Sequence, residues 1–182
     1  MPTPTAYLSS GAVISSCADY RYLLWRTWDD TKQPLVYIML NPSTADADQD
    51  DPTIRKCVGF ARRLGFGGIQ VLNLFAYRAT DPTTLKRARY PVGPDNDAVI
   101  YARLTALRLS EGGYVICAWG AHARGLVRAR TIETNLALNK VQARALRLLP
   151  DGTPAHPLML PYTCTPVPLE RHDHGIERRN EK

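Results

Sequence analysis

The chain has 182 residues, of which 45% are apolar and 22% charged, and it carries a formal net charge of +6. This is the composition of a globular protein, and no apolar run approaches the roughly 20 residues that span a bilayer, so we expect no membrane-spanning segment and no membrane partner. The basic balance favours polyanionic partners, namely nucleic acids such as DNA, or nucleotides.

Four cysteines lie far apart in the sequence, at Cys17, Cys57, Cys117 and Cys164. None belongs to a Cys-x-x-Cys pair, which argues against a zinc or iron–sulfur site, and we expect reduced, partly buried side chains. The first residues, MPTPTAYLSS, lack the basic start and the apolar segment of a signal peptide. A cytoplasmic location is therefore expected.

Local patterns predict the elements of the first half of the chain. Residues 1–6 are expected to be disordered, and the β-rich runs GAVISSC and YRYLLWRTW, separated by Ala18-Asp19, predict an antiparallel hairpin. The apolar run over 34–40 is typical of a strand buried on both faces. Asp51 and Pro52 suit the cap and first turn of the helix that follows, and glycines end it.

Strands and helices alternate through the second half as well. We expect a strand over 69–77, a helix over 96–110, a strand over 114–119 followed at Gly120 by a short helix, and a helix over roughly 128–141. Residues 143–149 fit either a fourth strand or the end of that helix. The apolar side of the helix over 96–110 is expected to carry Val99, Ala102, Ala106 and Leu109.

This alternation predicts an α/β fold, a three-layer αβα sandwich with a mostly parallel central sheet plus the N-terminal hairpin. We expect one domain over residues 7–165 and a charged, disordered tail over 166–182. Ligands of such sheets bind outside the carboxyl ends of the strands. Four strand ends or following loops would then meet at one edge, and they carry Asn41-Pro42-Ser43, Asn73, Trp119-Gly120 and His156-Pro157.

The acidic run over Asp46–Asp51 resembles the start of a calcium-binding loop. It departs from that pattern because Asp51 stands where glycine is needed and Cys57 stands where the final glutamate is needed. Two interpretations stay open, a solvated loop leading into a helix cap and a magnesium–phosphate role for one of the aspartates. No metal site and no cofactor are predicted.

Each polar strand end has a structural and a functional interpretation. Asn41 can satisfy turn backbone or hold a ligand or a water, and a buried Asn73 can bind neighbouring backbone or the edge of a base. His156 can be an ordinary loop histidine or a catalytic one. Trp119 fits the core better than a ligand platform, and the basic residues Arg78, Lys86, Arg87 and Arg89 can follow phosphates or form a solvated face.

The order of four motifs resembles that of the uracil-DNA glycosylase superfamily: LNPS, LNLFAYRATDP, CAWGAHARG and AHPLML. The resemblance implies a glycosylase-like fold, with Asn41 positioning the hydrolytic water and His156 donating a hydrogen bond to the departing base. It implies substrate contacts at Pro42, Ser43, Asn73, Phe75, Tyr77, Arg78, Trp119 and Leu158. Two residues depart from the superfamily pattern. Ser43 stands in place of glycine and can narrow a base pocket, while Leu158 replaces a phosphate-binding serine and can act as an apolar wedge.

The chain also resembles, more closely and over most of its length, the bacterial and phage domain-of-unknown-function family 1643. The shared run is LNPSTAD…DPTIR…NLFAYRATDP…PVGPDND…WGAH…HPL, and it carries no established activity. Three hypotheses follow. The chain is a DNA-base glycosylase-like hydrolase that needs no metal, an enzyme of free nucleotides or nucleosides, or a non-catalytic nucleic-acid-binding protein with the same fold.

Overall fold

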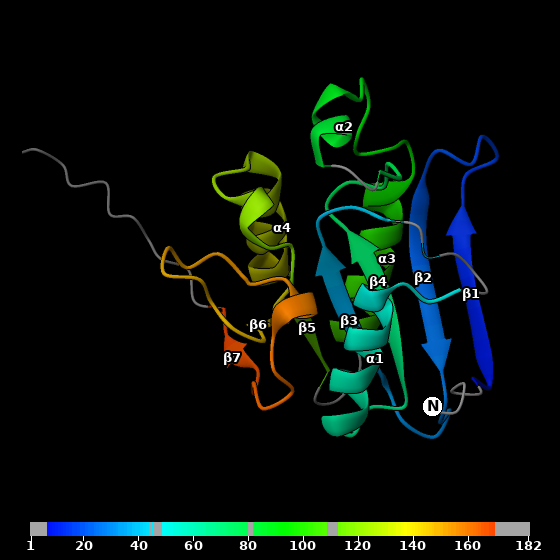
Figure 1. Cartoon of the computed structure of the whole chain (residues 1–182), viewed down its shortest axis with the longest axis vertical. Coiled ribbons are helices and arrows are strands. Elements are labelled where there is room, and N and C mark those ends of the chain that lie inside the picture. The colour runs from blue at the N-terminus through cyan, green and yellow to red at the C-terminus, as the bar shows by residue number, and fades with distance from the viewer. Residues whose placement is uncertain (1–6, 44, 46–48, 80–81, 109–112, 170–182) are drawn as a thin grey trace, which may run out of the picture.

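The computed structural model describes residues 7–43, 45, 49–79, 82–108 and 113–169, which form an α/β fold around one mixed sheet (Figure 1). The sheet has seven strands in the order β1-β2-β4-β3-β5-β6-β7. The strands are β1 Ser9–Ile14, β2 Arg21–Thr27, β3 Pro34–Met39, β4 Gly68–Asn73, β5 Tyr114–Cys117, β6 Gln142–Ala145 and β7 Val167–Pro168.

The predicted mostly parallel sheet is correct only for its centre. The four strands β4, β3, β5 and β6 are parallel, whereas β1, β2 and β7 pair antiparallel at the two sides. The predicted hairpin β1-β2 is confirmed, and it joins the sheet because β2 pairs with β4. Residues 143–145 belong to a strand, and β7 extends the sheet beyond the expected domain boundary at residue 165.

Helices cover both faces of the sheet, and Figure 1 shows α1 in front of it and α3 behind it. Their bounds are α1 Pro52–Arg63, α2 Pro82–Arg87, α3 Asn96–Arg108 and α4 Val127–Leu138, with single-turn 3-10 helices η1 Ala121–Ala123 and η2 Pro157–Met159. None of the helices in the described part of the chain combines the length and the hydropathy that a membrane span needs.

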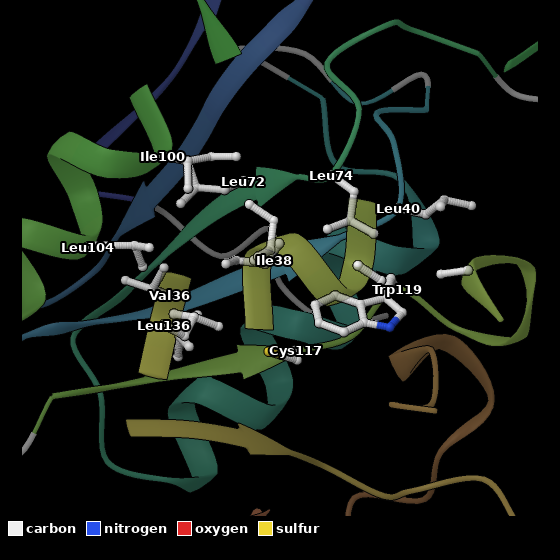
Figure 2. Packing of buried hydrophobic residues seen from close by; sticks show 14 of the residues in the cluster. Val36, Ile38, Leu40, Leu72, Leu74, Ile100, Leu104, Cys117, Trp119 and Leu136 are labelled. Carbon is white, nitrogen blue, oxygen red and sulfur yellow. The ribbon is translucent and has the colours of Figure 1, made fainter. Parts of the chain in front are cut away.

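The two sides of β3 belong to two hydrophobic clusters. Leu35, Tyr37 and Met39 pack with α1, while Val36 and Ile38 pack with α3 and α4 (Figure 2). This alternation follows from the two-residue period of a strand. Because both faces are covered, β3 is an almost continuous apolar run, as expected for a central parallel strand.

The sequence-based assignment of the buried side of α3 was wrong. Ile100, Leu104 and Leu107 are buried there, whereas Ala102 and Ala106 are exposed. Both sets recur at helical spacing, but leucine and isoleucine bury more apolar area than alanine, so the helix turns its larger side chains inward. Val99 is half-buried, and Leu109 lies outside the described residues.

A buried ion pair fixes the connection between β3 and α1. The Arg26 guanidinium, whose side chain is 1% exposed, donates to Asp50 Oδ1 at 2.8 Å, and the Tyr7 hydroxyl donates to Asp50 Oδ2. Burial raises the pKa of Tyr7, and the hydrogen bond to Asp50 raises it further. The next residue, Asp51, caps α1 by accepting from Ile54 N at 2.8 Å, which confirms the predicted cap.

We predict that Asp50→Ala lowers the free energy of unfolding by about 3 kcal/mol, because it removes the carboxylate that the buried Arg26 guanidinium binds. Urea denaturation followed by circular dichroism measures the change. Lys32→Ala, which removes an exposed partner of Asp29, is the control and should leave the midpoint nearly unchanged. Equal losses for the two variants would contradict the role of the buried pair.

Candidate functional site

A crevice is expected at the carboxyl ends of β3 and β5, because the chain leaves these neighbouring parallel strands toward opposite faces of the sheet. After β3 it runs to α1, and after β5 it runs through η1 to α4. The α1 side of the sheet also receives the segment after β6, where Ala155 and Leu160 join the cluster around α1. Ala45, from the segment after β3, belongs to the same cluster, so parts of these two segments pack on the same side of the sheet.

Asn41 follows β3, and its amide joins the turn after β3 to the segment after β4. Asn41 Nδ2 donates to Ala79 O at 2.7 Å and to Pro42 O at 3.0 Å. Ala79 N in turn donates to Pro42 O at 3.0 Å, so the segment after β4 is tied to the turn after β3. Both side-chain bonds are made by the nitrogen, which leaves Oδ1 as the atom that can accept from a water or a ligand.

Gly120 places the loop of His156 directly against the end of β5. Its φ is +75°, and a Cβ at this position would lie 2.9 Å from His156 Cβ. Gly120 N donates to Pro154 O at 3.0 Å. Only glycine provides both the left-handed backbone and this close approach, so the sequence Trp-Gly after β5 is a requirement of the site.

His156 is held in one tautomer when it is neutral. Its Nδ1 accepts from Leu158 N at 3.3 Å, so the ring proton is on Nε2. Burial lowers the pKa of His156, the Asp51 carboxylate raises it in part, and His122 lowers it further. The net shift is downward, and the neutral ring is the main form at pH 7. A neutral imidazole with its donor on Nε2 can stabilise a developing negative charge.

Asn73, the last residue of β4, is 1% exposed. Met39 of β3 is its register partner, and Val71, two residues earlier, packs on the α1 side of the sheet. Asn73 Nδ2 makes no hydrogen bond with any described residue. A buried amide needs a partner, which can be an ordered water or the carbonyl of a ligand. Its backbone oxygen is used differently, because it accepts from Asn96 Nδ2 at 3.0 Å.

The other predicted site residues divide into two groups. Pro42 is buried and Ser43 half-buried in the turn after β3, and Leu158 stands beside His156 with 39% of its surface exposed. The rings of Trp119, Phe75 and Tyr77 and the side chain of Arg78 do not gather with them. Trp119 is 2% exposed and belongs to the hydrophobic cluster that α3 and α4 cover (Figure 2). Phe75 and Tyr77 pack against the same cluster. The Arg78 side chain is directed elsewhere, because its Nη1 donates to Ala18 O.

Two aspartates of the acidic run, Asp50 and Asp51, have structural roles. Asp50 binds Arg26, and Asp51 caps α1. Asp46 and Asp48 lie outside the described residues. Within the described ranges, no three side chains of His, Cys, Asp or Glu gather closely enough to hold a metal ion.

Sequence reasoning missed three residues of this site. Asp51 was assigned a capping role only, Gly120 a turn, and His122 no role at all. Each follows directly on a motif that had been recognised, since His122 lies two residues after Gly120 and Asp51 ends the loop that Asn41 begins. The sequence alone does not show that Asp51 raises and His122 lowers the pKa of His156, because the three residues come from separate segments of the chain.

Comparison with known proteins identifies the family of the chain. The family described as "Protein of unknown function (DUF1643)" matches residues 21–158, which is most of the chain and includes Asn41, Asn73, Gly120 and His156. This confirms the closer of the two resemblances. No curated protein and no solved structure matches the chain, and the distant glycosylase resemblance stays a prediction.

We predict that His156 is neutral at pH 7, carries its proton on Nε2 and titrates below the ordinary histidine pKa of 6.5. Because the unfolded chain binds this proton more readily, His156 should reduce the free energy of unfolding as the pH falls below 6.5. Long-range ¹H–¹⁵N NMR correlation across a pH series reports both tautomer and pKa. A protonated ring at pH 7, or a proton on Nδ1, would refute the assigned geometry.

Proposed function

The chain belongs to the DUF1643 family, and we propose that the site around Asn41 and His156 hydrolyses the N-glycosidic bond of an extruded DNA base without a metal ion. The observation that carries the proposal is the neutral His156, whose Nδ1 is occupied and whose Nε2–H is free to serve a ligand. The glycosylase-like character of the fold belongs to the same proposal.

In the proposed reaction, a water attacks the anomeric carbon of the sugar while the bond from that carbon to the base nitrogen breaks. The bonding electrons pass to the base, which becomes anionic, and the water gives up a proton to solvent. The Nε2–H of His156 donates to the departing base as this charge builds. A preorganised donor of this kind is typically worth 10²–10³ in rate.

Asn41 orients the water in this scheme. Its Nδ2 is committed to Ala79 O and Pro42 O, so the amide is held in place while Oδ1 accepts a hydrogen bond from the water. An amide is a poor base, and its contribution is therefore orientation rather than proton abstraction. The neighbouring Ser43 side chain narrows the space for a base compared with a glycine.

Base recognition is assigned to the unpartnered amide of Asn73, which can donate to a base carbonyl. Extruding a base costs a few kcal/mol of lost stacking, and the exposed Leu158 can fill the place that the base leaves. The net charge of +6 supports binding to the DNA backbone.

We predict that the protein releases a base from at least one member of an oligonucleotide panel carrying uracil, other deaminated, mismatched and hypermodified bases. His156→Ala should lower the single-turnover rate by about 10²–10³, and Asn41→Ala by about 10². Strand cleavage at the abasic product by alkali measures both rates. Asn135→Ala, on α4, is the matched control and should retain the full rate.

Three measurements distinguish the hydrolase from the alternatives: base release, turnover of free nucleotides and DNA binding. Folded protein that yields no abasic product from any oligonucleotide contradicts the hydrolase. Magnesium-dependent turnover of a free nucleotide would point to a nucleotide-processing enzyme in its place. Salt-sensitive DNA binding without turnover would leave a binding protein with this fold.

A further inference from the structure

A cavity lies next to the chain that continues β4, away from the candidate site residues. It has a volume of about 560 Å³ and is lined by Tyr20 and residues 89–94. This volume falls in the range of small-ligand sites, which is roughly 300–1,000 Å³. None of the residues of the proposed reaction lines it, so the cavity needs a separate explanation.

Backbone hydrogen bonds fix the walls of the cavity. Ala76 N donates to Val92 O and Tyr77 N donates to Pro91 O, both at 3.1 Å, and Tyr20 forms a β-bridge with Tyr77. Gly93, with φ at +83°, allows the turn to approach the Tyr20 ring, because a Cβ there would lie 2.7 Å from Tyr20 Cδ1. The site is therefore formed before any ligand arrives, which lowers the entropic cost of binding.

The lining combines aromatic faces with a cation. Tyr90 is 63% exposed, and the Arg89 guanidinium lies over its ring, 5.1 Å from the centroid. Tyr20 faces the ring of Tyr22 at an interplanar angle of 5° and meets the edge of Tyr77. Aromatic planes next to an arginine suit a flat ring attached to an anion, which describes a nucleotide unit.

We propose that this cavity stacks an unpaired base of single-stranded DNA that flanks the reacting nucleotide. The proposal rests on the proposed function, whose substrate it narrows to a single strand. Bases within a duplex stack on each other, whereas the bases of a single strand can stack on exposed tyrosines.

The position of the cavity favours a polymer over a free nucleotide. Tyr20 precedes β2, and His156 lies against the end of β5, three strands away in the order β2-β4-β3-β5. Three strand intervals of about 4.8 Å amount to roughly 15 Å. A strand of several nucleotides can occupy both places at once, and a single nucleotide cannot.

The test is fluorescence anisotropy with fluorescein-labelled oligothymidylate of twelve nucleotides. Tyr90→Leu should raise Kd about tenfold, because leucine keeps apolar bulk but offers no ring for stacking, and Tyr90→Phe should restore wild-type affinity. Arg89→Ala should weaken binding and reduce its salt dependence. Tyr101→Leu and Arg108→Ala, exposed on α3, are matched controls and should bind like the wild type.

Unchanged affinity in both Tyr90→Leu and Arg89→Ala would overturn the proposal, as would tighter binding of a blunt duplex, of an RNA twelve-mer or of a proline-rich peptide. The affinity for oligothymidylate tests the stacking proposal, whereas the release of a base tests the hydrolase. A protein that binds single strands through Tyr90 but releases no base would refute the proposed reaction alone.

Discussion

The parallel pairing of β3 with β4 on one side and β5 on the other is the constraint on which the rest of the structure depends. Leu35, Tyr37 and Ile38 are fully buried between helices on both faces, so this strand has one possible register. The register places the end of β3 between the ends of its neighbours. Asn41 follows this central strand, Asn73 ends its neighbour β4, and the His156 loop lies against Gly120, which follows its other neighbour β5.

Backbone atoms hold the candidate site residues in place. Asn41 is fixed by two carbonyl groups, Gly120 by the carbonyl of Pro154, and His156 by the amide of Leu158. Backbone partners cannot rotate away as side chains do. This construction holds a hydrogen-bond donor and an acceptor in fixed directions, which is the requirement of electrostatic preorganisation.

Local signals were sufficient for much of the fold. The buried run at 34–40, the Asp51 cap and the hairpin were predicted from the sequence because each depends on neighbouring residues. The buried side of α3 was not, because alanine and leucine recur there at the same spacing and only the sheet decides between them. For the site, Asn41 and His156 could be predicted because each belongs to a loop that follows a strand. The influence of Asp51 and His122 on the pKa of His156 could not be predicted, because these residues are far apart in the chain. The same holds for the cavity, which is formed by Tyr20 and residues 89–94.

The two-residue strand β7 has a consequence for the behaviour of the protein at high concentration. Without it, β6 would offer an open row of backbone groups to other copies of the chain. Val167 pairs with Ala145 and Leu169 N donates to Ala143 O, so that row is occupied, and Pro168 contributes no N–H of its own. A short, proline-containing outer strand closes the parallel core against intermolecular β-pairing, and so protects the sheet from aggregation on this side.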